Sequence, residues 1–266
     1  MAPFGAFETL IVEPAAADHV VRLSLNRPEA RNAISRQLAS DLIAACGELA
    51  TADDVRAVVV TGSGDRAFCA GADLRERDRL TAEERTGHTA LIEEAAERLA
   101  ALPMPTIAAV RGYALAGGTE LALACDVRVA ASDAVFGLPE VRIGIFPGAG
   151  GVLRLPALVG QGTARDLLFT GRQVPAAEAA RIGLVDRLVA PDEVLAAAEA
   201  LAAEIAGNAP LAVRAVKQAL IAASGRSPAE ARPEVNRLRG TLDATADYSE
   251  GLRAFVEKRQ PRFTGR

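Results

Sequence analysis

Short apolar runs alternate with amphipathic segments along the first two thirds of the chain, and this alternation limits the possible folds more than any other feature. Residues 19–25 and 55–61 have strand character, and a helix with apolar residues at helical spacing follows Ser35, a residue type that often caps helices. Further strands are predicted at 106–110, 127–130 and 134–136. The repeating order of strand, strand or loop, then helix predicts an α/β fold and excludes a pure helical bundle or a β-sandwich.

Two regions depart from this alternation. Residues 75–87 are highly charged and are expected to form a mobile loop with helical turns ahead of a helix at 88–102. From about residue 193 the pattern is purely helical, with helices predicted at 194–205, 210–223, 229–245 and 249–258. We therefore expect a core over 1–195 and a C-terminal helical region over 196–266, which packs on the core or on a neighbouring subunit.

Composition excludes several classes of protein. The net charge of −4 disfavours a nucleic-acid partner, and the three cysteines and two histidines form no CxxC pair or metal-binding cluster. Reduced thiols, no secretory signal and no apolar run of about 18–20 residues predict a soluble cytoplasmic protein that spans no membrane. Phosphate-loop, nucleophile-elbow, HExxH and EF-hand motifs are missing, so neither a metal nor a nicotinamide cofactor is expected.

Five segments carry the chemical signal, and their order and spacing matter more than any one of them. They are NRPEARNAI at 26–34, AFCAGADL at 67–74, GYALAGGTELALACD at 112–126, FGLPEVRIGIFPGAGG at 136–151 and AFVEKRQPRFTGR at 254–266. From about residue 7 to its end, the chain resembles the enoyl-CoA hydratase/isomerase (crotonase) family. The resemblance implies a crotonase-type superhelix of ββα units. It also implies a helical tail that covers the active site and forms homotrimers, often stacked as hexamers.

Thioester chemistry explains why small residues surround these motifs. A reaction at the α or β carbon of an acyl thioester develops negative charge on the carbonyl oxygen, and two fixed backbone N–H groups stabilise it. Small residues allow such close approach of the backbone, although Gly and Ala alone more often indicate only tight turns. By resemblance to the family, the two donors belong to Ala72 and Gly117, and the substrate is an acyl-CoA that brings its own coenzyme A.

Two glutamates are the candidate acid and base. Taken alone, Glu120 is a helix-dipole partner in the first turn of a predicted helix, and Glu140 is a solvated loop carboxylate. The resemblance implies instead that both flank the Cα=Cβ bond, with Glu120 activating water and Glu140 delivering a proton. It also places the backbone of Gly148 against the water or hydroxyl.

The resemblance assigns coenzyme A to residues that sequence alone treats as ordinary surface. These are Arg27, Ala30, Arg31, Ala70, Asp73, Leu74, Arg75 and Lys258. Guanidinium groups suit phosphates, whereas solvated surface arginines are an equal alternative for each. Lys258 matches a family position that reaches the coenzyme A of a neighbouring subunit.

The chain departs from many family hydratases at Ala116 and Thr119, where glycine and cysteine are common. Both replacements are small, so we expect the backbone path to persist. Ile145 and Phe146 make the wall beside the proposed water more apolar. The sequence predicts reversible syn hydration of a trans-2-enoyl-CoA. A Δ3,Δ2-enoyl-CoA isomerase needs only one proton-shuttling carboxylate, and a non-catalytic acyl-CoA-binding subunit needs neither.

Overall fold

A six-stranded sheet forms one layer of the molecule, which a computed structural model describes over residues 4–266. Its strands lie in the order β1 (Leu10–Pro14), β2 (Val20–Leu25), β3 (Ala57–Gly62), β5 (Thr106–Val110), β7 (Val127–Ala131) and β10 (Arg187–Val189). The β1–β2 pair is antiparallel, and the other neighbours are parallel. The central strands are apolar and buried, as expected of a parallel sheet covered on both faces.

A second, four-stranded sheet follows the same winding order as the first. Its strands are β4 (Ala67–Cys69), β6 (Tyr113–Leu115), β8 (Val135–Gly137) and β9 (Gln173–Pro175). The chain passes from β3 to β4, from β5 to β6 and from β7 to β8, and each pair is followed by one or more helices. This repeat is the predicted ββα spiral. It also brings the ends of β4, β6 and β8 to one edge, because these three strands are parallel neighbours.

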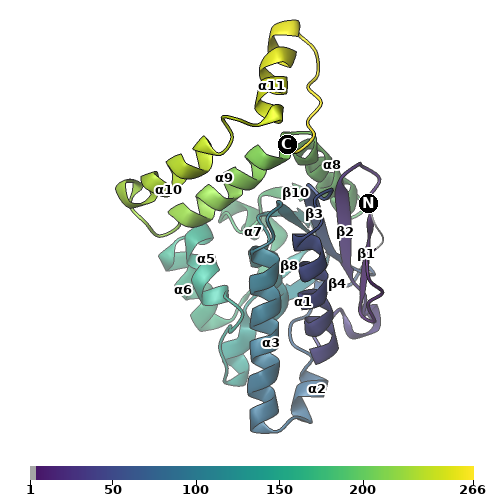
Figure 1. The fold of residues 1–266 in the computed structure, drawn as a ribbon. Helices are drawn as coiled ribbons and strands as arrows, with labels where there is room; N and C mark the ends of the chain where they lie inside the picture. The colour runs from purple at the N-terminus through teal and green to yellow at the C-terminus, as the bar shows by residue number, and fades with distance from the viewer. Residues whose placement is uncertain (1–3) are drawn as a thin grey trace.

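Helices cover both layers. The core helices are α1 (Arg36–Ala50), α2 (Leu74–Asp78), α3 (Ala82–Ala100), α4 (Gly117–Ala124), α5 (Gly151–Val159), α6 (Gln161–Thr170), α7 (Ala176–Arg181) and α8 (Val194–Ala206), with 3-10 turns η1 (Pro28–Ala30) and η2 (Pro139–Ile143). Helices α1 and α3 run side by side (Figure 1). Helix α8 packs on the six-stranded sheet through Ala198 and Ala202.

The charged segment 75–87 is more ordered than the sequence predicted. Asp73 caps α2 by accepting the backbone N–H groups of Arg75 and Glu76. Helix α3 begins at Ala82 rather than at residue 88, because Thr81 and Glu84 form a reciprocal capping box. The helical turns expected in this segment are present as α2, but the expected start of the next helix at residue 88 was wrong, and the capping residues were the overlooked signal. The predicted helix 229–245 was too long, since α10 (Pro228–Gly240) ends five residues earlier.

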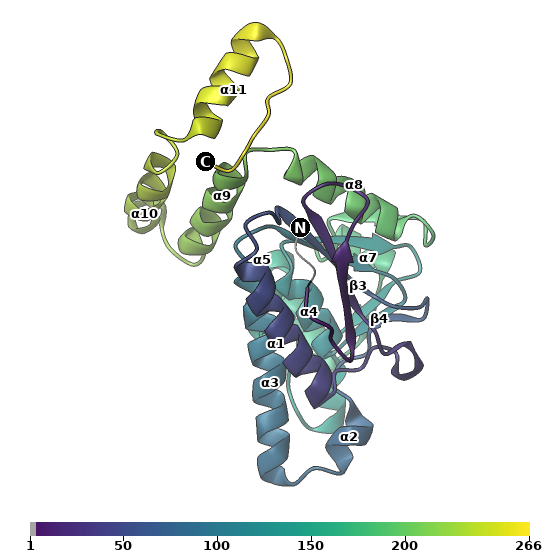
Figure 2. The same ribbon diagram turned by 45° about the vertical axis from the view of Figure 1, so that its right-hand side comes forward.

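The last three helices, α9 (Pro210–Ala223), α10 and α11 (Ala246–Glu257), extend away from the two sheets (Figure 2). Lys217 fastens α9 to the core, because its buried ammonium group donates to Asp126 Oδ2 at 2.7 Å and to the Met104 carbonyl at 3.0 Å. No single helix in residues 4–266 is long and apolar enough to cross a membrane, and the apolar pair α8 and α9 is bent by 107°. The proposed division after residue 195 stays a prediction.

Candidate active site

A cavity of about 810 Å³ opens between α3, the start of α4, η2 and the loop before α5. All the residues that line it fall between Ala70 and Leu153. Within the described chain, the helical tail does not contribute to this cavity, so the expected cover does not come from the same subunit. Predicted residues Ala70, Ala72, Leu74, Gly117, Glu120, Glu140 and Gly148 all line it.

Two turns meet at the inner end of the cavity, one after β4 and the other after β6. A Cβ atom on Gly71 would lie 2.7 Å from the Ala116 methyl and 3.3 Å from the Gly117 nitrogen. The Ala72 N–H donates to no acceptor among residues 4–266. Gly117 is the first residue of α4, where N–H groups have no acceptor within the helix. Ala72 and Gly117, the two predicted backbone donors, are 45 positions apart in the sequence but lie side by side in the structure.

The start of α4 is packed tightly against the second sheet. A Cβ atom on Gly118 would lie 2.0 Å from the Cys69 carbonyl oxygen, so only glycine fits there. The Thr119 hydroxyl lies 2.6 Å from the Ala114 carbonyl and 2.9 Å from the Gly137 carbonyl, and it accepts the Gly137 N–H at 3.1 Å. Threonine is therefore accommodated by hydrogen bonds to β6 and β8, and the backbone path persists as expected.

Glu120 projects from the first turn of α4 and is buried. Its Oε1 accepts the N–H groups of Ala149 and Gly151, each at 2.8 Å. Burial raises the pKa of Glu120 above its ordinary value, and the two N–H groups together with the charge of Arg154 oppose part of that rise. The carboxylate form is therefore supported by specific contacts despite its burial.

Glu140 lies in η2 and is also buried, which corrects the alternative that it is a solvated loop carboxylate. Its Oε2 has no hydrogen-bond partner among residues 4–266. Burial raises its pKa to about 7, and the negative charge of Glu120 adds to the rise. The two carboxyls thus share one cavity, but only Glu120 has hydrogen bonds from two N–H groups that favour its ionised form.

The outer wall of the cavity is formed by the loop between η2 and α5. A Cβ atom on Gly148 would lie 3.2 Å from the Thr89 methyl, so the loop approaches α3 closely at this residue. Ile145 and Phe146 line the cavity as expected of an apolar wall, but the Phe146 side chain is 67% exposed. Phe146 therefore lies at the cavity mouth.

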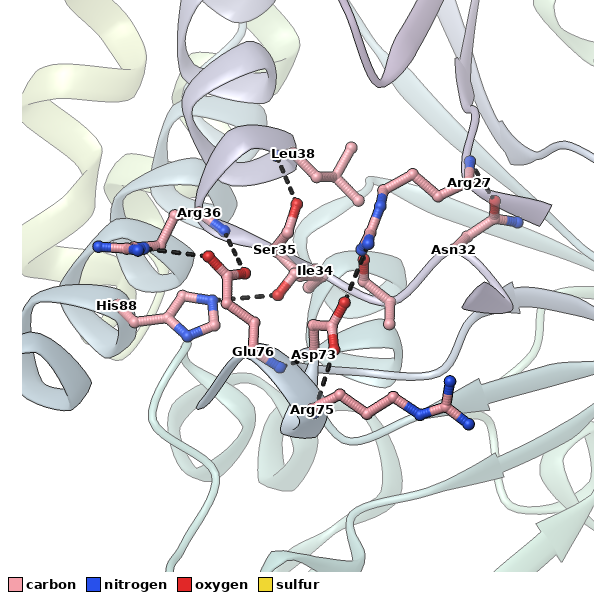
Figure 3. Close-up of polar contacts among 11 residues, drawn as sticks. Arg27, Asn32, Ile34, Ser35, Arg36, Leu38, Asp73, Arg75, Glu76 and His88 are labelled. Atoms are coloured by element: carbon pink, nitrogen blue, oxygen red, sulfur yellow. Dashed lines mark hydrogen bonds and ion pairs between the residues drawn. The ribbon is translucent and has the colours of Figure 1, made fainter. Parts of the chain in front are cut away.

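Three of the residues predicted to hold coenzyme A, Arg27, Asp73 and Arg75, lie in or beside the segment 27–36 (Figure 3). Arg27 is not free there, because its guanidinium donates to the Ala33 carbonyl at 2.5 Å and to Asp73 Oδ2 at 3.0 Å. The Asp73 carboxylate is likewise occupied by Arg27 and by the first turn of α2. These contacts fix both side chains within the segment, and their contact with coenzyme A stays a prediction.

Other predicted coenzyme A residues remain accessible. Arg31 and Arg75 are exposed and form no side-chain hydrogen bond or ion pair within the described residues. Ala30 is half-buried at the end of η1, and the Ala70 N–H donates to the Arg31 carbonyl. Lys258 ends α11 and lies outside the cavity lining of this chain. Its contact with coenzyme A stays a prediction that needs a second subunit.

Sequence reasoning missed three residues that shape the site. Asn32 is fully buried and donates to the Ser63 and Ala67 carbonyls, while its Oδ1 accepts the Arg27 N–H. His88 is fully buried, and its Nε2 donates to the Ile34 carbonyl at 3.0 Å, beside the Asp73 N–H bonded to the same oxygen (Figure 3). Arg154 contacts the turn that binds Glu120. Nothing in their local sequence pattern distinguished them from ordinary polar residues.

No group of three or more His, Cys, Asp or Glu side chains within residues 4–266 is arranged to hold a metal ion. The chemistry that this cavity offers consists of two backbone donors, one carboxyl group hydrogen-bonded by two N–H groups and one carboxyl group with a pKa of about 7.

Comparison with known proteins identifies the class. A family model described as enoyl-CoA hydratase/isomerase matches residues 15–266. The crystal structure of an enoyl-CoA hydratase from Bacillus anthracis superposes with a TM-score of 0.95 at 40% identity, covering 97% of this chain and 100% of that one. The fold is therefore the crotonase fold, and the chain belongs to the enoyl-CoA hydratase/isomerase family.

Two curated relatives extend this similarity at the level of sequence. The short-chain-enoyl-CoA hydratase of Clostridium acetobutylicum is 40% identical over 241 residues, 91% of this chain and 92% of that protein. The crotonyl-CoA hydratase of Syntrophomonas wolfei is 40% identical over 258 residues, 97% of this chain and 98% of that protein. The similarity spans both the two-sheet core and the helical tail.

The backbone at Ala116 generates a stability prediction. Ala116 has φ +50° and ψ −125°, a conformation that costs a residue with a side chain about 1–2 kcal/mol. Ala116→Gly removes this strain but adds roughly 0.4–1 kcal/mol of backbone entropy to the unfolded state. We expect a net gain of about 0.5–1 kcal/mol in the free energy of unfolding, measured by urea denaturation at fixed protein concentration.

Ala114→Gly is the matched control, because Ala114 is buried in β6 and is not among the residues with positive φ. It should lose stability. Equal losses in both variants would contradict strain at Ala116.

Proposed function

We propose that this protein is an enoyl-CoA hydratase that reversibly adds water to a trans-2-enoyl-CoA to give a 3-hydroxyacyl-CoA. The observation that carries the proposal is the pair of buried carboxyls in one cavity, of which Glu120 is hydrogen-bonded by two N–H groups and Glu140 has a pKa of about 7. Hydration needs one group that accepts a proton and one that donates it, and these environments suit the two roles. The names of relatives 40% identical to this chain support the same reaction.

In this mechanism the thioester carbonyl lies between the Ala72 and Gly117 N–H groups. Water loses a proton to Glu120 as its oxygen bonds to Cβ, and electrons of the Cα=Cβ bond move toward the thioester. The resulting enolate oxygen is stabilised by the two N–H donors, and the positive end of α4 adds to their effect. Glu140 then gives its proton to Cα. The product contains all the atoms of water, and the enzyme regains its starting state after proton exchange with solvent.

Isomerisation of a Δ3 double bond is the second candidate reaction, and it needs only one carboxyl group. It would leave either Glu120 or Glu140 without a role. Glu120 has two N–H donors and Glu140 has a pKa of about 7, so each carboxyl has a distinct environment suited to a role in hydration. A non-catalytic acyl-CoA-binding subunit would need neither environment.

Glu120→Gln and Glu140→Gln should each reduce the rate of crotonyl-CoA hydration by roughly 10²–10⁴-fold, because each removes a proton-transfer group. In Glu120→Gln, the oxygen of the new side-chain amide can still accept the Ala149 and Gly151 N–H groups, so the turn should keep its shape. The measurement is the loss of conjugated enoyl-thioester absorbance, with product identified by chromatography and folding checked by circular dichroism.

Near-normal rates in either variant would exclude that carboxyl from the reaction. Conversion of 3-enoyl-CoA by the unmodified protein, with no hydration of short, long or branched 2-enoyl chains, would establish the isomerase instead. Binding without turnover would establish the non-catalytic subunit.

The pH dependence of hydration should be bell-shaped, with its falling side near the pKa of Glu140. Glu120 must be ionised, so kcat/KM should rise with pH through its pKa, which burial places above the ordinary value. Glu140 must be protonated, so kcat/KM should fall as pH increases through about 7. Steady-state assays from acid to alkaline pH test this profile. A rate that is flat across neutral pH while chemistry limits turnover would contradict the assignment of Glu140.

We further propose that the tail forms a homotrimer or a hexamer of two trimers. Several apolar side chains on α9 and α11 are exposed in the single chain, including Leu220, Leu252, Phe255 and Val256. Phe255 is 85% exposed, so Phe255→Asp should cost a monomer little but should dissociate an assembly that buries this residue. Light scattering after size-exclusion chromatography tests the mass of both proteins.

Ala229→Asp adds the same charge at an exposed residue of α10 and should preserve the assembly. A monomeric unmodified protein, or an assembly insensitive to Phe255→Asp, would contradict this role of α11.

A further inference from the structure

The turn at residues 149–151 holds the Glu120 carboxylate, and the contacts that hold this turn are therefore relevant to the reaction. Two of its three residues donate their N–H groups to the same oxygen, Glu120 Oε1. A change in the direction of either N–H would alter both the position and the charge of the carboxylate. The turn is not part of a sheet, and its last residue, Gly151, is the first residue of α5.

Arg154, one turn into α5, reaches back to this segment. Its Nη1 donates to the Ala149 carbonyl at 2.9 Å, and its Nη2 lies 2.5 Å from Glu97 Oε1 on α3. The guanidinium thus connects the turn to α3, which also lines the cavity. Its planar fork allows two fixed contacts at once, which a lysine ammonium group cannot reproduce with the same geometry. The Arg154 side chain is 20% exposed, so the contacts are partly shielded from solvent.

The Arg154 guanidinium packs directly against Gly150, in the middle of the turn. Gly150 has φ +98°, and a Cβ atom there would lie 2.0 Å from Arg154 Nη1. The position favours glycine both for its backbone conformation and for the guanidinium packed against it. Gly150, the two N–H donors and Arg154 therefore form one local arrangement around the Glu120 carboxylate.

Charged groups approach this arrangement from three elements besides α4. Glu93 and Glu97 come from α3, Glu140 and Arg142 come from η2, and Arg154 comes from α5. Among these, the charge of Arg154 favours the ionised form of Glu120, whereas Glu93 opposes it. The cationic charge nearest to the turn is also the one that contacts it directly.

We propose that Arg154 is a positioning residue that keeps the Glu120 carboxylate ionised and correctly directed, through its bond to Ala149 and through its charge. This inference rests on the proposed hydratase function for its kinetic consequence. Its structural part concerns Glu120 alone and does not depend on the identity of the substrate.

The test compares Arg154→Gln, Arg154→Lys and Glu97→Gln with the unmodified protein. In Arg154→Gln, the acidic side of the kcat/KM profile should move to higher pH, so that the loss of activity is greatest at low pH. KM for crotonyl-CoA should change less than kcat, because Arg154 does not line the cavity. In Arg154→Lys, which keeps the positive charge, the acidic side of the profile should lie close to that of the unmodified protein. Its kcat should remain lower, because the bond to Ala149 is not fully reproduced. Glu97→Gln keeps Arg154 and its bond to Ala149, so the acidic side should stay in place or move to lower pH.

Infrared difference titration of the Glu120 carboxyl band, identified by its loss in Glu120→Gln, separates this proposal from the hydratase proposal. If the unmodified protein does not hydrate enoyl-CoA, the band must still titrate at higher pH in Arg154→Gln. An unchanged titration overturns the role of Arg154 even in an active hydratase. The same result follows if Arg154→Gln and Glu97→Gln move the titration in the same direction, or if Arg154→Lys behaves like Arg154→Gln.

Discussion

The close approach of two backbone turns, 71–72 and 116–117, is the contact on which the rest of the site depends. Parallel pairing of β4 with β6 brings both turns to the same edge of the second sheet. Helix α4 starts from the second turn, and its direction determines where Glu120 enters the cavity. The contact between these two turns thus determines how the second sheet, helix α4 and the cavity are arranged around one another. Small residues are required there because a larger side chain would separate the turns.

The two carboxyls differ because of the main chain around them more than because of neighbouring side chains. Burial raises the pKa of both Glu120 and Glu140. Two N–H groups compensate Glu120 by hydrogen-bonding to one oxygen, whereas Glu140 keeps one oxygen without a protein partner in the described chain. The three residues 149–151 thus give chemically identical side chains different surroundings, and they favour the ionised form of Glu120 alone.

The sequence predicted the repeated units of the fold well, because buried parallel strands and capped helices leave strong local patterns. Ser35 accepts the Leu38 N–H as an N-cap, and α9 has the predicted bounds. The short strands β9 and β10, only three residues each, were missed because their stability comes from pairing with distant strands. Residues 75–87 were misinterpreted because their charge suggested solvation, although Thr81 and Glu84 carried a capping signal.

The order of the motifs predicted the residues that line the cavity, but other roles in the site became visible only from contacts in the structure. The resemblance to the family, and not the residues themselves, implied that Glu120 and Glu140 meet, and in the structure both line one cavity. The sequence predicted that Arg27 could meet a phosphate, but it did not indicate that its guanidinium donates to Ala33 and Asp73. Arg154 looked like a surface arginine because its partners, Ala149 and Glu97, lie in different elements. Such roles depend on the direction of a long side chain, which spacing along the sequence does not define.

The lack of space at Gly118 also limits how this protein can evolve. Any other residue at this codon would force α4 away from Cys69 and would disturb the adjacent Gly117 donor before it altered the choice of acyl group. Ile143 at the end of η2 and the loop residues Ile145 and Phe146 have exposed surface and border the cavity without belonging to this crowded contact. Substitutions along the mouth can therefore change the shape of the cavity without disturbing its inner end.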